Sequence, residues 1–399
     1  MLIILERKGD SDTSSINHKI HKILLFLTSL KRLTNKTFAL AGLSILLATS
    51  CLQGQVLKDS ATISLIKKGI DYVYNFEFND ANRISEELRN KYPGHPLNYF
   101  YKGMITYWEN YPLVANSSAR NSFEGDMRNC IELCDHNKDT TNKSETLLIN
   151  LCARGLLLLF YTDNDLSFEV FPIAASTYEC IRRSFDYTSH YSDFYFFTGV
   201  YNYYREAYPE AHPVYKTLAF LFPRGSKSEG IKELVSVADN SIMLKAEAYT
   251  FLTEIYLSFE NNYQKATVYS KGLHYIYPDN PEYLGSYIKN LLLIKQYDQA
   301  EKEILSSDSR KNNHYFQAQV TIFNGIVQEK KYHDTKKAQQ FYEKGIKDMS
   351  EFRSYGYEYE AYAYFGLSRI SEMNGDSNNQ KLYRKLAMKL AYFNNIDFD

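Results

Sequence analysis

The sequence predicts an all-α fold in which antiparallel helix-turn-helix repeats stack as a solenoid. Only 18 glycines and 9 prolines occur in 399 residues. No long stretch alternates apolar and polar residues, so helices are favoured over strands. A spacing also recurs along the chain, and a fixed period of about 20 to 50 residues is the usual sign of a repeat architecture.

The recurring spacing appears at two scales. Tyr263 and Ala266 are followed by Tyr297 and Ala300 with an offset of 34 residues. A longer pattern occurs twice with identical internal spacing, as Ala81, Leu88, Tyr92, Pro93 and Pro96 and again as Ala266, Leu273, Tyr277, Pro278 and Pro281. Proline ends a helix but suits a first helical turn. The pattern therefore predicts helices that end before Pro93 and Pro278 and helices that begin near Pro96 and Pro281.

These residues resemble the tetratricopeptide-repeat (TPR) family, in which a small residue early in the second helix of each pair lets the two helices approach closely. The small residues here are Ala81, Ala266, Ala300 and Ala338. The first helices carry bulky, small and aromatic residues at Leu65, Gly69 and Tyr72 and a similar series at Tyr249, Leu252 and Tyr256. The resemblance implies a TPR-like α-solenoid. Its repeats are degenerate, since no proline follows Ala300 at the family's spacing.

The pattern divides the chain into regions. Residues 51–109 and 229–399 carry the repeat-like residues, whereas residues 110–228 are rich in aromatic side chains and show no clean register. In that middle region we expect helices at 122–134, 144–160, 172–185 and 191–207 and loops at 135–143 and 222–228. The closing helix is expected at 376–393. Short segments between Gly199 and Ala248 weakly resemble the inclusion-body-clearance family of TPR proteins, which supports the repeat fold and implies no function.

Residues 1–50 predict export to a bacterial cell envelope. Lys31, Arg32 and Lys36 precede an uncharged run of 13 residues from Thr37 to Thr49, which is the order found in signal peptides. This run is too short to cross a hydrocarbon core of about 30 Å as a helix. We expect a signal peptide here, preceded by residues that reflect a start codon placed too far upstream; a genuine N-terminal extension is the alternative.

The end of the apolar run resembles the lipobox of bacterial lipoproteins. Ala48, Thr49 and Ser50 stand directly before Cys51, although the family prefers leucine where Ala48 stands. The resemblance implies that Cys51 is lipidated and anchors the chain to the outer membrane. Residues 52–58 lack the acidic cluster typical of surface export, so a periplasm-facing orientation is favoured. Ordinary cleavage, which would leave a soluble periplasmic or secreted protein, is the alternative.

Charge and motifs argue against nucleic-acid binding and against catalysis. The first 50 residues hold 7 basic and 3 acidic side chains, so 39 Lys and Arg and 44 Asp and Glu remain beyond them, interspersed and without a basic stripe. This balance provides no electrostatic footprint for nucleic acid. No nucleophile elbow, glycine-rich phosphate loop or paired-histidine zinc motif is present. We therefore expect neither an enzyme nor a cofactor.

The cysteines allow two readings. Cys130 and Cys134 lie one helical turn apart and precede Asp135 and His136, but a zinc site needs further ligands at recognisable spacing, so burial in the core is favoured over metal binding. In an oxidising envelope one disulfide among Cys130, Cys134, Cys152 and Cys180 is the alternative, and the sequence does not decide between a disulfide and free thiols. Cys134 and Cys152 are the favoured pair.

The architecture predicts a scaffold that binds a protein or peptide partner, because stacked helix pairs form a concave surface lined by the first helix of each pair. Candidate contact residues on these helices are Asn98, Lys102, Tyr249, Thr253 and Tyr287. The aromatic stretch from Tyr187 to Tyr208 is interpreted mainly as packing between helices, but Tyr195, Tyr203 and Arg205 are further candidates for recognition.

A second hypothesis is glycan capture. Some TPR-containing outer-membrane lipoproteins bind starch-like glycans by stacking sugars on aromatic side chains, and the 36 tyrosines and 24 phenylalanines of this chain resemble that composition. The chain has one tryptophan, so the similarity is partial. Tyr195 and Tyr203 would then be the sugar platforms.

Overall fold

Every regular element in the described part of the chain is a helix, which confirms the predicted all-α class. The computed structural model describes residues 56–137, 141–307, 313–391 and 398. The predicted signal peptide and Cys51 lie outside these residues. The helices are α2 (Ser60–Tyr74), α3 (Phe78–Lys91), α4 (Pro96–Glu109), α5 (Arg120–Asp135), α6 (Lys143–Asp163), α7 (Ser167–Ser184), α8 (Phe194–Ala211), α9 (Lys216–Ala219), α10 (Lys227–Asn240), α11 (Lys245–Glu254), α12 (Tyr263–Ile276), α13 (Pro281–Leu293), α14 (Tyr297–Ser306), α15 (His314–Lys330), α16 (Thr335–Met349), α17 (Tyr357–Met373) and α18 (Ser377–Leu390).

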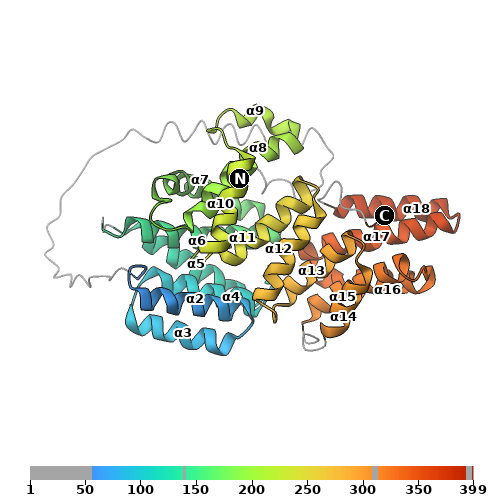
Figure 1. Cartoon of the computed structure of the whole chain (residues 1–399), viewed down its shortest axis with the longest axis horizontal. Helices are drawn as coiled ribbons and strands as arrows, with labels where there is room; N and C mark the ends of the chain where they lie inside the picture. Colours follow the sequence, from blue (N-terminus) through green and yellow to red (C-terminus); the bar gives the residue numbers. More distant parts are fainter. Residues whose placement is uncertain (1–55, 138–140, 308–312, 392–397, 399) are drawn as a thin grey trace. The chain divides into compact units, whose positions relative to one another are not determined.

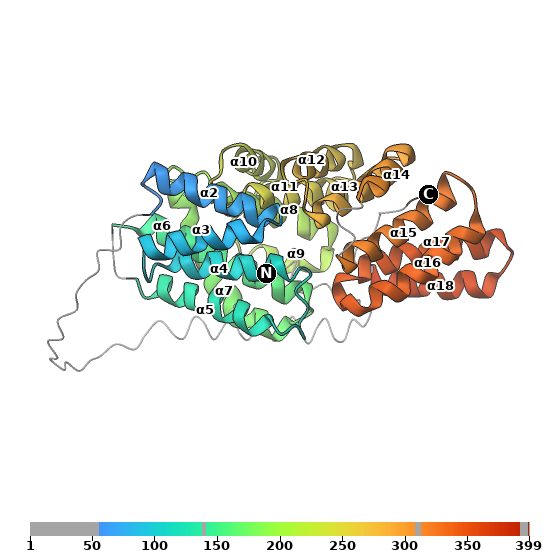
Figure 2. The same cartoon turned by 90° about the horizontal axis from the view of Figure 1, so that it is seen from below.

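Consecutive long helices pack against one another as antiparallel pairs, as Figures 1 and 2 show. The first helices of neighbouring pairs also touch, so that α2 contacts α4 and α4 contacts α6, while α13 contacts α15 and α15 contacts α17. This is the contact pattern of a repeat solenoid, in which each unit buries its apolar face against the next unit.

The prolines and alanines of the sequence pattern have the predicted places. Helices α3 and α12 end at Lys91 and Ile276, and α4 and α13 begin at Pro96 and Pro281. The small residues of the second helices are fully buried at Ala81, Ala266, Ala300 and Ala338. Gly69 of α2 faces Ile84 of α3 so closely that a Cβ would lie 2.8 Å from that side chain. At these positions a small residue lets the two helices of a pair approach closely.

The same tight turn joins the two helices of most pairs. In each case the residue two positions before the second helix has a left-handed backbone, with φ between 50° and 72°, at Phe76, Asp165, Asn261, Lys295, His333 and Gly375. The following residue donates its N–H to a carbonyl of the first helix, as from Glu77 to Tyr72 at 2.8 Å. This satisfies a carbonyl at the helix end in the manner of a Schellman motif.

Residues 110–228 also form antiparallel helix pairs, although their sequence shows no repeat register. The predicted helices of this region are confirmed as α5, α6, α7 and α8, and α6 and α7 are joined by the tight turn at Asp165. Two other pairs, α4 with α5 and α8 with α10, are joined by longer connections in place of the tight turn. Residues 110–119 separate α4 from α5, and residues 212–226, which include α9, separate α8 from α10. The irregularity thus lies in two insertions.

Helices α8 and α10 form one pair despite the insertion between them. A Cβ on Gly230 of α10 would lie 2.6 Å from the carbonyl oxygen of Gly199 of α8, so the two backbones are in direct contact. Asp193, buried just before α8, accepts hydrogen bonds from the backbone of Ile242, Met243 and Leu244 ahead of α11. The packing is therefore continuous across position 228, where the repeat register resumes.

Helix pairs from distant parts of the sequence also contact each other. Tyr277 donates to the Asp71 carboxylate at 2.9 Å, and the Asn280 amide donates to the Tyr74 carbonyl at 2.9 Å. The Trp108 ring lies edge-on to that of Tyr283, with centroids 5.7 Å apart. These contacts join α2 and α4 to α12 and α13 through a buried aromatic cluster.

One described helix, α6, is long and apolar enough to cross a membrane by length and composition. About 67% of its most apolar window is buried inside the protein. Helix α6 packs between α5 and α7 and also contacts α4. We interpret it as a core helix.

Candidate functional site

The insertion between α8 and α10 is held firmly on α8 at its second half. Arg205 of α8 donates through Nη2 to the carbonyl oxygens of Ala219 and Phe222, the latter at 3.0 Å. Tyr201 donates to the Pro223 carbonyl at 2.8 Å. Gly225 is pressed against α8, where a Cβ would lie 2.8 Å from the Arg205 Cβ. Residues 219–225 thus follow the surface of α8.

This fixed segment presents large apolar side chains to solvent. Phe220 is 77% exposed and Leu221 is 47% exposed. The neighbouring Phe222 turns inward, where its ring packs edge-on against Tyr178 of α7 at 5.3 Å. Because the backbone on both sides of Phe220 is hydrogen-bonded to Arg205, the exposed ring is displayed from a positioned scaffold.

Helix α7, which contacts the insertion through Tyr178, also carries exposed aromatic side chains. Phe168 is 88% exposed and Phe171 is 39% exposed. Phe171 and Tyr178 are seven residues apart, which places them on the same side of α7, about 10 Å apart along its axis. We name the adjacent side chains of Phe220 and Leu221 the apolar surface. Adjacent exposed apolar groups mark protein interaction sites more often than scattered single residues do.

Three of the candidate contact residues are buried, namely two of those expected on the concave face and one from the aromatic stretch. Tyr203, Thr253 and Tyr287 have 0%, 6% and 3% of their surface exposed. Tyr203 donates to Glu260 at 2.7 Å, and Tyr287 stacks on His274 with ring centroids 5.8 Å apart. Large amphipathic side chains on a first helix are used here to pack the pairs together, so they cannot contact a partner in this structure.

The other predicted residues are more accessible. Lys102 is exposed and lies 3.2 Å from the buried Asp126 carboxylate. Asn98 is half-buried and donates to the Tyr92 carbonyl at 2.7 Å. Tyr195 and Tyr249 are half-buried as well, and Tyr249 faces Tyr269 of α12 rather than solvent alone. These side chains come from separate helices, and the structure does not gather them into one site.

Arg205 is the predicted residue with the clearest role. It is half-buried and positions the insertion. No local pattern marks the apolar surface as exposed, because Phe220 and Leu221 lie within the continuous apolar run 218–222. The available signal was the loop chemistry at 222–228, which places these residues at the edge of a connection.

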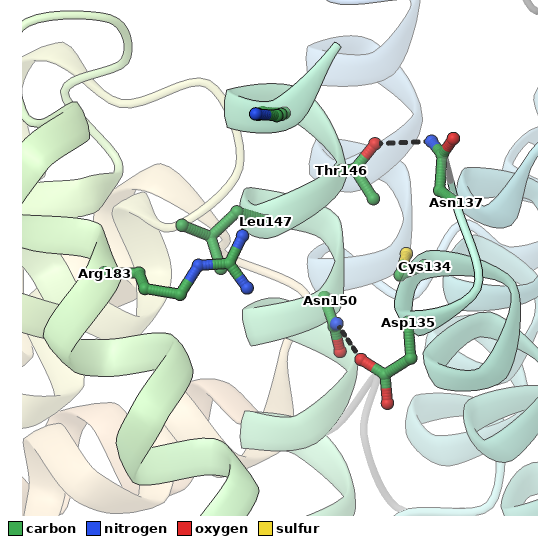
Figure 3. A pocket seen from close by; sticks show the side chains of 8 residues that line it. Cys134, Asp135, Asn137, Thr146, Leu147, Asn150 and Arg183 are labelled. Atoms are coloured by element: carbon green, nitrogen blue, oxygen red, sulfur yellow. Dashed lines mark hydrogen bonds between the residues drawn. The ribbon is translucent and has the colours of Figure 1, made fainter. Parts of the chain in front are cut away.

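A small polar pocket of about 150 Å³ lies between α5, α6 and α7 (Figure 3). Asn137 donates to Thr146 at 2.9 Å and Asn150 donates to Asp135 at 2.7 Å across it, while Arg183 reaches in from α7. Behind it the buried Arg154 pairs with Asp135 at 2.7 Å. Most of its polar groups already bond one another, which indicates a role in joining the three helices.

The four described cysteines are buried free thiols. Burial raises the pKa of Cys130 and Cys152 well above the ordinary thiol value, and burial also raises the pKa of Cys180. A raised pKa keeps a thiol protonated and unreactive. In this structure Cys134 and Cys152 are not bonded to each other. Within the described ranges, no group of three or more His, Cys, Asp and Glu side chains is arranged to hold a metal ion.

Two carboxyl groups are largely shielded from water by the surrounding helices. Burial raises the pKa of Glu247 to about 7, although Tyr74 donates a hydrogen bond to it. Burial likewise raises the pKa of Glu282 to about 7, where Gln319 donates at 3.1 Å. Both groups lie among the aromatic rings that join α2 and α4 to α13, so they belong to the packed interior.

The fold and its surface define an all-α helical-repeat protein. In comparisons with known proteins, no family model matches the chain, and no curated protein matches it.

Proposed function

We propose that this protein is a helical-repeat scaffold of the bacterial cell envelope that binds a protein partner through the apolar surface and performs no catalysis. The observation that carries the proposal is the pinned insertion with its exposed Phe220 and Leu221. Aromatic anchors on a rigid backbone supply most of the energy in protein interfaces, and insertions in repeat proteins often form the binding face. Lipidation of Cys51, on the outer membrane and facing the periplasm, would keep the scaffold at its place of action.

The proposal departs from binding in a concave groove. Several first-helix aromatic residues are buried against other first helices, as in the contact between Trp108 and Tyr283. Phe220 and Leu221 of the insertion are instead exposed next to each other on a positioned backbone. The glycan hypothesis finds less support, since Tyr203, one of its two platforms, is packed inside the protein.

The test is crosslinking and affinity capture of the full chain from its native envelope. The variant Phe220→Ser/Leu221→Ser removes the apolar anchors. Its control, Val268→Ser/Tyr275→Ser, removes side chains of α12 that are 65% and 63% exposed. We expect a partner that the wild type and the control recover, and at least about tenfold less of it with the insertion variant, because interface anchors contribute about 2 kcal/mol or more. Equal recovery by all three chains would refute the proposal, and so would the lack of any partner.

A further inference from the structure

Glu145, at the start of α6, holds the first described residues of the chain. Its carboxylate accepts hydrogen bonds from the backbone N–H of Val56 at 3.2 Å and of Leu57 at 2.7 Å. His95 Nε2 lies 3.2 Å from the same carboxylate, and the Glu145 side chain is buried. Hydrogen bonds to a charged acceptor are stronger than neutral ones. The backbone of Val56 and Leu57 is therefore fixed against the N-terminal end of α6.

This attachment limits how far the fold can lie from Cys51. Cys51 is five residues before Val56, and an extended residue spans at most about 3.5 Å, so the two Cα atoms are within roughly 18 Å of each other. If Cys51 carries a lipid, the surface beside Val56 must stay close to the bilayer. The backbone on both sides of Phe220 is held by Arg205, which lies 11 residues after the start of α8 and therefore about 17 Å along its axis.

The surface beside Val56 is an open hollow of about 460 Å³ between the start of α6 and the connection from α7 to α8. It is lined by Leu57, Lys58, Thr141, Lys143, Ser144, Tyr187, His190 and Tyr191, without a carboxylate among these residues. We name these eight residues the headgroup hollow.

The chemistry of the headgroup hollow suits a lipid surface. Lys58 and Lys143 are exposed and, within the described ranges, neither forms an ion pair, so their ammonium groups can meet a phosphate. Tyr187 and Tyr191 are half-buried, with an apolar ring and a polar hydroxyl. Tyrosine is enriched at the level of membrane headgroups for this reason, and lysine near a membrane is attracted to anionic lipids.

We infer that the headgroup hollow docks on the anionic phospholipid headgroups of the membrane in which Cys51 is anchored, so that the apolar surface is held away from that membrane. This inference rests on the proposed lipid anchor at Cys51. The occupant follows from the short tether, from the two exposed lysines and from the tyrosines of the hollow. Docking would orient the scaffold, because one flexible tether alone leaves the protein free to rotate.

The test places a photo-crosslinking amino acid at His190 or, as the control site, at Phe220 in the full chain within its native envelope. Mass spectrometry of the crosslinked protein measures phospholipid adducts, and mass spectrometry of the N-terminal peptide reports whether Cys51 is lipidated. We expect at least fivefold more phospholipid on residue 190 than on residue 220. The variant Lys58→Glu/Lys143→Glu should lower the adducts at 190 by about fivefold for each lysine. The control Lys381→Glu/Lys385→Glu, on α18, should leave them unchanged.

The outcomes separate the inference from the proposals it rests on. A lipidated Cys51 with equal phospholipid adducts at both positions would overturn the docking and leave the anchor standing. A protein adduct in place of lipid at residue 190 would also overturn it. An unmodified Cys51 would overturn the anchor together with the docking. The protein partner captured at residue 220 is an independent readout of the proposed function.

Discussion

Helices α13 and α14 are joined by three residues, whereas residues 212–226 separate α8 from α10. Both pairs otherwise pack in the same way, with small residues or glycines where the helices touch. All three residues of the short connection belong to the tight turn at Lys295. The long connection carries exposed apolar side chains that the packing of the pair does not require. The difference teaches that the repeat plan provides the scaffold and that a departure from it provides the candidate binding surface.

The largest expected effect compares the packing of the two regions. Tyr342 of α16 is fully buried, packs against Gly325 and Gly366, and donates to Glu329 at 2.6 Å. Tyr203 of α8 is equally buried. Tyr342→Ala and Tyr203→Ala should each lower the free energy of unfolding by about 3–5 kcal/mol in urea titrations. The exposed Tyr275→Ala should change it by less than about 0.5 kcal/mol. If Tyr203→Ala lowered the free energy of unfolding only slightly while Tyr342→Ala lowered it by the expected amount, the middle region would lack a repeat-like core.

The second prediction concerns the buried contact between α2 and α11. The pKa of Glu247 is raised by burial to about 7, from about 4.5 in the unfolded chain. The folded state therefore retains this proton over a range in which the unfolded state loses it. The contribution of the protonated Glu247 to the free energy of unfolding is fully present below about pH 4.5. The free energy of unfolding then falls by roughly 3 kcal/mol as the pH rises to about 7. Urea unfolding at pH 5 and pH 7.5 should show this loss in the wild type and a smaller one in Glu247→Gln. Equal losses in both proteins would contradict it.

A third and smaller effect tests whether the middle region and the C-terminal repeats unfold together. Asp193 accepts three backbone hydrogen bonds from residues 242–244. Asp193→Ala leaves these donors unpaired and should cost about 2 kcal/mol, in a single transition followed by circular dichroism. Asp193→Asn retains one acceptor and should cost less. Two separate transitions in the wild type would mean that position 228 is a true domain boundary.

The smallest effect on stability is expected at the apolar surface. Phe220→Ser should change the free energy of unfolding by less than about 0.5 kcal/mol, because the ring is mostly in water in the folded and in the unfolded state. Thermal unfolding measures this. A loss of more than about 1 kcal/mol would indicate that Phe220 packs against the protein, and it would weaken the assignment of a binding role.

The sequence by itself determined the helical class and the ends of several helices. Pro96 and Pro281 begin helices, and Ala81, Ala266, Ala300 and Ala338 lie buried at helix crossings, because proline geometry and side-chain volume act locally. The export signal and lipidation of Cys51 also come from sequence alone and remain predictions.

Only the tertiary structure decided which aromatic residues are buried and which are exposed. The sequence suggests Thr253 and Tyr287 as contact residues, yet both are buried, and Tyr203 is buried with its hydroxyl bonded to Glu260, 57 residues further along the chain. The tight turn at Phe76, Asp165 and Lys295 has no glycine to mark it, since its backbone is imposed by the two packed helices that it joins. Phe220 reads as core and is exposed because Arg205 holds its neighbours on α8. Burial depends on contacts between segments far apart along the chain, and a local pattern does not contain them.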